Sequence, residues 1–450
     1  MSLTAAQRQE EKQKLLAGGF SEVEQGIYRR KKQEAAAELE ALLTEVSESP
    51  EAEVIARQLK ERHGYRAVRK QTVTITTMTG DRITIPTWYA LPAEPAPRKR
   101  GRNGHGDHLL LRYWGFFGKQ SMRYTNRIVR SAVACSSYDL AEAELKEQGI
   151  TMTSYGIDKL AQNVGKLAQE RRSTVALGSR ESFKGKRVIV AIDGGRARMR
   201  EEKPGRRKKD QKMQGFSSPW REPKLAVIAE LDEEGKYRKG TKPIYEATLD
   251  GHDAIFDLLK TLAVHTDLKE AREIVLSGDG AVWIWQKYAW LTETLGMQGN
   301  VTEILDFYHA AEHLTAICEA NTALTEQERR VWFARLRDLL REGTYAALRQ
   351  SVETESRVRG LPQLMELFQY FERNRARMRY DVYAKNKQPI GSGIVESAIR
   401  RVINLRIKSP SIFWNRERLE RILQLRCMLM AGRWDIFMHN LQAAVQFTLR

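Results

Sequence analysis

The chain has 450 residues, of which 42% are hydrophobic, so it can bury a sizeable core and form about three domains. That content excludes an intrinsically disordered chain. Its 75 Lys and Arg residues outnumber its 57 Asp and Glu residues, and the resulting net charge of +18 favours a polyanionic partner.

Cysteine usage and hydropathy exclude further classes. Cys135, Cys318 and Cys427 are far apart and form no Cys-x-x-Cys pair, which argues against a disulfide framework and a cysteine zinc site. The N-terminus lacks a basic-then-apolar signal pattern, and no apolar run approaches the roughly 18 residues that span a bilayer. We therefore expect a cytoplasmic protein without a membrane partner.

The N-terminal part predicts helices and then a hairpin. Apolar residues recur at helical spacing over residues 5–62, with breaks near residues 18–19 and 47–50, so we expect two or three helices. Apolar and polar residues alternate over 72–88 on both sides of a turn at Gly80, as in a β-hairpin. The following proline-rich and then basic stretch, 91–104, predicts a linker or a basic loop.

Residues 138–167 predict a helix, a turn at Gly149 and a second helix with polar residues near its start. A helix-turn-helix would place such polar residues in a DNA major groove. An ordinary helical hairpin explains the same pattern, and no base contact can be inferred from the sequence. The two interpretations remain open for this segment.

The central region predicts three strands, a helix, a strand, a helix and a strand. The first strand, 188–193, is a β-branched apolar run that ends on Asp193 and two glycines, and the fourth, 273–278, ends on Asp279 between glycines. This element order is that of an RNase H-like fold, a mixed five-stranded sheet in which these two strands are central neighbours. A helical insertion, 311–390, should follow before Glu396 on the first turn of a later helix.

Asp193, Asp279 and Glu396 therefore form a candidate metal site and catalytic site. Hard Mg²⁺ prefers oxygen ligands and keeps several waters, so two Asp and one Glu from separate elements suffice. Asp193 would bridge two ions. Asp279 would complete the coordination shell of one ion, and Glu396 would complete that of the other. Two such ions activate the attacking oxygen and neutralise the leaving oxygen in phosphoryl transfer. Any one of these acids alone is more simply a strand-end or capping carboxylate.

Cations follow two of these acids closely. A run of cations is usually a solvated loop, but beside a metal site it would contact phosphates. We expect these residues to bind DNA: Arg196, Arg198, Arg200, Arg206, Arg207, Lys208, Lys209 and Lys212 after Asp193, with Lys203 among them, and Arg400, Arg401, Arg406 and Lys408 after Glu396.

Four motifs together resemble one family: Asp193-Gly-Gly, Gly-Asp279-Gly, Asp306-Phe-Tyr-His309 and Gly-Ser-Gly-Ile-Val-Glu396-Ser. They are similar to the DDE-type insertion-sequence transposases of the ISKra type, distant relatives of Mutator-like transposases, over about residues 185–435. Relatives often carry paired cysteines after a segment like the 71–89 hairpin, and this chain has none.

The resemblance implies an enzyme that cuts element ends and joins them to target DNA with two Mg²⁺ ions, for which Mn²⁺ can substitute. It implies catalytic roles for Asp193, Asp279 and Glu396 and a family signature at Asp306 and His309. It also implies double-stranded DNA as partner, a homo-oligomer on DNA, and a nucleoid-associated location in the cytoplasm.

Two rival functions remain. His309-Ala-Ala-Glu312-His313 has the order of an inverted zinc peptidase motif, although that reading gives Asp193 and Asp279 no role. An RNase H-like DNA nuclease, or a domesticated DNA-binding protein, would keep the fold without transposition.

These patterns divide the chain as follows: 1–66, an N-terminal helical region; 67–107, a hairpin and basic linker; 108–184, a helical, helix-turn-helix-like candidate DNA-binding region; 185–310, the first part of the catalytic core; 311–390, the helical insertion; 391–450, the Glu helix and C-terminal helices.

Overall fold

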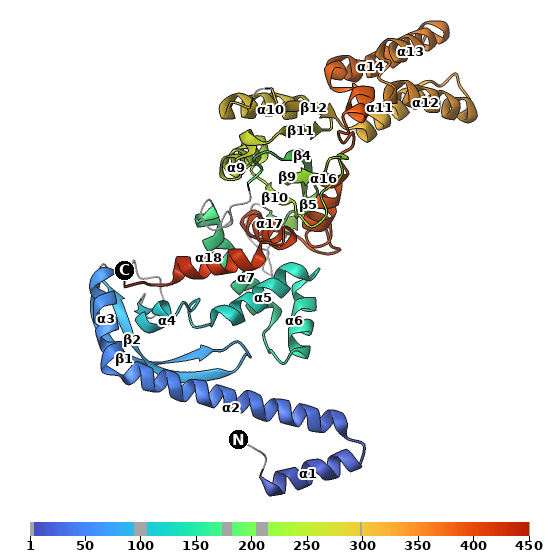
Figure 1. Cartoon of the computed structure of the whole chain (residues 1–450). Coiled ribbons are helices and arrows are strands. Elements are labelled where there is room, and N and C mark those ends of the chain that lie inside the picture. The colour runs from blue at the N-terminus through green and yellow to red at the C-terminus, as the bar shows by residue number, and fades with distance from the viewer. Residues whose placement is uncertain (1–3, 94–105, 173–181, 204–214, 298, 450) are drawn as a thin grey trace. The chain divides into compact units, whose positions relative to one another are not determined.

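The computed structural model describes residues 4–93, 106–172, 182–203, 215–297 and 299–449 (Figure 1). The chain forms two compact units. The first unit comprises Met1–Ala132, Tyr138–Ala161 and Met438–Arg450, and the second comprises Val133–Ser137 and Gln162–Phe437. The fold is mixed α/β.

Three helices open the first unit, as the sequence predicts: α1 (Ala5–Leu16), α2 (Phe20–Glu48) and α3 (Pro50–Arg62). Each starts where capping chemistry allows. The Thr4 side chain caps α1 in a capping box, and Ser49 accepts a hydrogen bond from the Ala52 amide at the start of α3, beside a proline at its first position.

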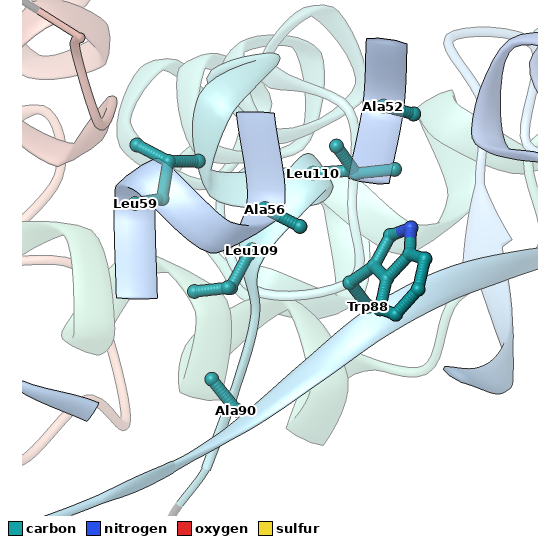
Figure 2. Packing of buried hydrophobic residues seen from close by; sticks show 7 residues of the cluster. All are labelled: Ala52, Ala56, Leu59, Trp88, Ala90, Leu109 and Leu110. Atoms are coloured by element: carbon teal, nitrogen blue, oxygen red, sulfur yellow. The ribbon is translucent and has the colours of Figure 1, made fainter. Parts of the chain in front are cut away.

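The expected hairpin consists of β1 (Tyr65–Thr76) and β2 (Arg82–Pro92), which pair antiparallel from Thr76 opposite Arg82 outward. Strand β3 (Asp107–His108) extends this sheet beside β2 and leads into α4 (Leu109–Tyr113). Figure 2 shows one core cluster in which α3, β2 and α4 meet. Its side chains come from Ala52, Ala56, Leu59, Trp88, Ala90, Leu109 and Leu110.

Further helices include α5 (Met122–Ala134), α6 (Tyr138–Glu147) and α7 (Ser154–Glu170). The last two are the predicted helix pair, and Gly149 between them has a positive φ of 74°. Exposed residues of α7 recur at four-residue steps, at Tyr155, Lys159 and Asn163, so a polar face points to solvent. Whether this face binds DNA stays a prediction.

The second unit contains a five-stranded sheet with the order β10-β9-β4-β11-β12. Strand β4 (Arg187–Gly194) runs antiparallel to β9 (Lys224–Leu231) and parallel to β11 (Glu273–Gly278). The edge strands are β10 (Ile244–Thr248), antiparallel to β9, and β12 (Val301–Leu305), parallel to β11. The prediction that the first and fourth strands are central neighbours is therefore confirmed.

Helices cover both faces of this sheet, which explains the continuous apolar runs of its strands. Helix α9 (Gly251–His265) packs on β9 and β10, and α10 (Val282–Leu295) packs on β11 and α9. Helix α16 (Gly393–Ala398) packs on β4 and β9, on the other side of the sheet from α9 (Figure 1).

The predicted helical insertion follows β12. It consists of α11 (Phe307–Ala320), α12 (Glu326–Arg341), α13 (Tyr345–Arg359), α14 (Gln363–Asn374) and α15 (Tyr380–Lys385). Helix α11 packs against α12 and α14. After α16 come the π-helical turn η3 (Ile399–Asn404), α17 (Arg416–Met430) and α18 (Trp434–Val445). In the described part of the chain, no helix has the length and apolar character needed to cross a membrane.

Candidate functional site

Two carboxylates lie together at the ends of the central parallel strands. The last paired residues of β4 and β11 are Ala191 and Ser277, and Asp193 and Asp279 each follow that pair by two positions. Side chains two positions apart on a strand share a face, so both carboxylates leave the sheet at the same edge and height. Strand pairing thus brings together two acids that are 86 positions apart in the sequence.

Backbone amides orient both acids. The Gly194 amide donates to Asp193 Oδ1 at 2.6 Å, and the Ala281 amide donates to Asp279 Oδ1 at 2.9 Å. Among the described residues, the second oxygen of each carboxylate has no hydrogen-bond partner and remains available for a ligand.

The charge of the pair is unfavourable by itself. Burial raises the pKa of Asp193, and the charges of Asp279 and Glu222 raise it further, whereas the Gly194 amide and the His309 imidazolium oppose that rise. Two like charges close together repel each other. A bound cation would relieve the repulsion, so this donor set fits a hard divalent ion.

The Glu222 side chain approaches Gly194 closely. A Cβ placed on Gly194 would overlap Glu222 Oε1, so the missing side chain makes room for that carboxylate. Gly194 pairs with Lys224 across β9, and the Lys224 ammonium lies 2.9 Å from Glu222. Glu222 is therefore a further acid beside Asp193.

A side chain of the helical insertion holds the backbone of Asp279 in place. The Tyr370 hydroxyl on α14 donates to the backbone oxygen of Asp279 at 2.7 Å. Gly280 has a φ of 91°, and a Cβ there would meet the Tyr370 hydroxyl at 2.6 Å. The glycine after Asp279 thus permits both the left-handed turn and the tyrosine contact.

Asp306 holds the starts of two helices. Its Oδ1 accepts hydrogen bonds from the Tyr308 and His309 amides, at 2.7 and 2.9 Å, and so caps α11. Its Oδ2 accepts from the Ser392 amide, which precedes α16. Its own amide donates to the Gly278 oxygen at 2.9 Å. Asp306 is fully buried and ties β11, α11 and α16 together.

His309 adds a positive charge to this edge. Its Nδ1 lies 3.5 Å from Asp306 Oδ1, an ion-pair contact longer than a usual hydrogen bond. The interaction with Asp306, reinforced by the charges of Asp193 and Glu312, outweighs burial and raises the pKa of His309 to about 9. The ring is therefore an imidazolium at neutral pH and a counter-charge to Asp193.

His313 has different surroundings from His309. Its ring stacks on Tyr370 with centroids 3.6 Å apart and an interplanar angle of 17°. Burial lowers the pKa of His313, and the charge of His309 lowers it further. The two histidines thus differ in partner and protonation.

Glu396 lies on α16 as an exposed side chain. Burial, followed by the charges of Asp306 and Glu396, raises the pKa of Tyr237 to about 12, so both acids act on one phenol. Among the described residues, no three or more His, Cys, Asp and Glu side chains are grouped to hold a metal ion. The structure thus pairs Asp193 with Asp279 without adding Glu396 as a third ligand.

Three expected DNA-binding cations follow Asp193 along an extended arm. Arg196 and Arg198 are exposed and Arg200 is half-buried, while the intervening Ala197 and Met199 are buried. Strand alternation therefore sends the three arginines to one side. The Arg198 guanidinium lies 5.0 Å from the Trp220 ring centroid on the paired strand. Lys203 is described and exposed, whereas the remaining expected cations of this loop lie outside the described residues: Arg206, Arg207, Lys208, Lys209 and Lys212.

The cations after Glu396 divide into two groups. Arg400, Arg401 and Lys408 are exposed. Arg406 is only 1% exposed, so the expectation that it is a surface cation is wrong for this structure. Its guanidinium donates to the Ser136 oxygen at 3.3 Å and lies 5.0 Å from the Trp414 ring centroid. These contacts make Arg406 part of the core.

Three residues near the acids were not expected: Glu222, Tyr370 and Ser392. Tyr370 and Ser392 contact Asp279 and Asp306 across long separations in sequence, and neither spacing nor composition could identify those contacts. In the sequence, only two glycines could have indicated such close contacts, because Gly194 and Gly280 leave room for Glu222 and Tyr370. No model of a known protein family matches the chain, and no curated protein sequence is significantly similar to it.

Proposed function

We propose that this chain is a DDE-type DNA transposase of an insertion sequence, which cleaves element ends and transfers the strands into target DNA. The observation that carries this proposal is the placement of Asp193 and Asp279 beyond the same residue pair of two parallel strands. Paired carboxylates at that position suit metal-dependent phosphoryl transfer. The four motifs that resemble ISKra-type transposases support the same function.

The sheet supports an RNase H-like core. The spatial order of its strands is β10-β9-β4-β11-β12. Along the chain, the first three strands, β4, β9 and β10, are antiparallel, and the last two, β11 and β12, run parallel to β4. The helical insertion falls between β12 and the Glu396 helix, as the proposal requires. Asp193 and Asp279 would hold Mg²⁺ or Mn²⁺, and Glu396 would join them when α16 and the DNA are in the active arrangement.

The bound ions would supply activation of the attacking oxygen and neutralisation of the leaving oxygen. The protein's own residues would prepare the site. Backbone amides hold one oxygen of Asp193 and of Asp279, and among the described residues the other oxygen has no hydrogen-bond partner. Asp306 fixes the start of the Glu396 helix, and protonated His309 balances the charge of Asp193 before a cation binds.

The cationic side chains would bind the DNA backbone. Arg196, Arg198 and Arg200 extend from the end of β4, next to Asp193, and Arg400, Arg401 and Lys408 follow Glu396. Cations next to the acids would hold a phosphodiester near the metal ligands, and their contribution would weaken with salt. A homo-oligomer on DNA would bring two element ends together.

A nuclease without strand transfer is the second candidate, because the same acids would serve it. A zinc peptidase is less well supported. His309 lies 3.5 Å from Asp306, and a zinc site at His309 and His313 would leave the neighbouring acids Asp193 and Asp279 without a role.

The test is cleavage and joining of labelled DNA that carries the ends of the element, with Mg²⁺ and the purified chain. We expect nicked ends and joined products with wild type, and neither with Asp279→Asn, while both proteins retain DNA binding. Cleavage without joined products would favour the nuclease. Full cleavage by Asp279→Asn would remove Asp279 from the site.

A further inference from the structure

Helix α2 carries an apolar stripe that the first unit does not cover. Tyr28, Ala35, Leu39, Leu42 and Val46 follow one another at steps of seven, four, three and four residues, which places them on one face of a helix. All five are exposed, with Tyr28 at 59% and Leu42 at 55% of full accessibility.

A neighbouring face of α2 already has its partners. Ala36 and Leu43 pack against the hairpin cluster that contains Val73 and Ile85. The Glu40 carboxylate accepts a hydrogen bond from the Thr84 amide at 3.2 Å. The helix therefore has two apolar faces, and only one of them is needed to hold it on the hairpin. An exposed apolar stripe of this kind is typical of a protein interface.

The charge pattern of α2 indicates what covers the stripe. Residues 29–32 are four consecutive cations, whereas residues 33–48 contain five glutamates and no cation. A helix with this polarity is complementary to a reversed copy of itself. In a parallel pair the cations would face cations, and the glutamates would face glutamates. Like charges at such positions are destabilising.

We propose that α2 pairs with α2 of a second copy of this chain, antiparallel and about a two-fold axis, before any DNA binds. Tyr28 then faces Val46 of the second copy, and Ala35 faces its Leu39, each pair occurring twice. Lys31 lies beside the stripe near one end and comes next to Glu45 of the second copy. The stripe spans about 27 Å at 1.5 Å per residue, the length of a short coiled coil.

The test is the mass of the full chain in solution without DNA, by sedimentation or light scattering across a dilution series. We expect twice the chain mass of 51.7 kDa. Leu42→Glu should raise the dimer dissociation constant at least about tenfold, because each dimer then buries two charges. Ala37→Glu is the matched control, because it adds the same charge at an exposed position on another face of the helix.

Charge reversal tests the antiparallel register. Lys31→Glu and Glu45→Lys should each weaken the dimer, and the two together should restore it. These surface changes leave the apolar stripe intact, so they remain informative if Leu42→Glu impairs folding. A monomeric wild type at the highest soluble concentration would overturn the proposal. So would a dimer that neither Leu42→Glu nor single charge reversal weakens. The inference does not depend on the proposed function.

Discussion

The Ser392 amide donates a hydrogen bond to Asp306 Oδ2, which joins the start of the Glu396 helix to the end of the sheet. Asp306 also caps α11 and contacts His309, so one buried carboxylate serves three elements. The Asp-x-x-His motif therefore has a structural role here: it positions the elements that carry the other acids.

Asp306→Asn should destabilise the second unit by about 1–3 kcal/mol. An asparagine has a single side-chain acceptor oxygen, which cannot accept hydrogen bonds from the starts of both helices. Burial raises the pKa of Asp306, but hydrogen bonds from His309 and Ser392 outweigh it, and the net pKa lies below 3.8. The stabilisation is thus present above pH 3.8 and is lost as the pH falls through the lowered value. Denaturant unfolding of the wild type and of Asp306→Asn, at pH 7 and at pH 3, would measure the difference between their free energies of unfolding. This difference should be smaller at pH 3.

His309 should titrate near pH 9 rather than 6.5. Because folding raises this pKa, the imidazolium stabilises the fold fully below pH 6.5, and this contribution is lost as the pH rises to about 9. An NMR titration of the imidazole carbons would give the value. Asp306→Asn should move it down towards 6.5. A wild-type midpoint near 6.5 would contradict the ion pair with Asp306.

Gly280→Ala should destabilise the protein more than Gly240→Ala. Both glycines have positive φ, at 91° and 86°, so each alanine incurs backbone strain of about 1–2 kcal/mol. Only the Cβ at position 280 also meets a side chain, Tyr370, whereas nothing lies within 4 Å at position 240. Thermal unfolding of the two variants would compare them. Equal decreases in melting temperature for the two variants would show that Tyr370 does not constrain Asp279.

Arg198→Ala should weaken DNA binding most at low salt. Arg198 is exposed, and its guanidinium lies over the Trp220 ring. Removal of one phosphate contact should lower the slope of log affinity against log salt by about 1. Binding titrations at several salt concentrations would measure it. Arg406→Ala is the contrasting variant, because that buried residue should affect stability and leave the slope unchanged.

Much of this arrangement could be predicted from the sequence because it depends on local patterns. The apolar runs that end on Asp193 and Asp279, and the order of strands and helices, were enough to place these acids on neighbouring strands. The contacts of Glu222 and Tyr370 could not be predicted, because they depend on strand register and on packing of the insertion. The burial of Arg406 was missed because cations are usually exposed; here a carbonyl and an indole ring surround the guanidinium.

The central claim is that Asp193 and Asp279 together hold a divalent cation. The most direct measurement is a Mn²⁺ titration of the purified chain followed by electron paramagnetic resonance, with Mg²⁺ as competitor. We predict saturable Mn²⁺ binding that Mg²⁺ displaces, and at least about tenfold weaker binding in Asp193→Asn and in Asp279→Asn. Mn²⁺ binding of unchanged affinity in both variants would contradict the account.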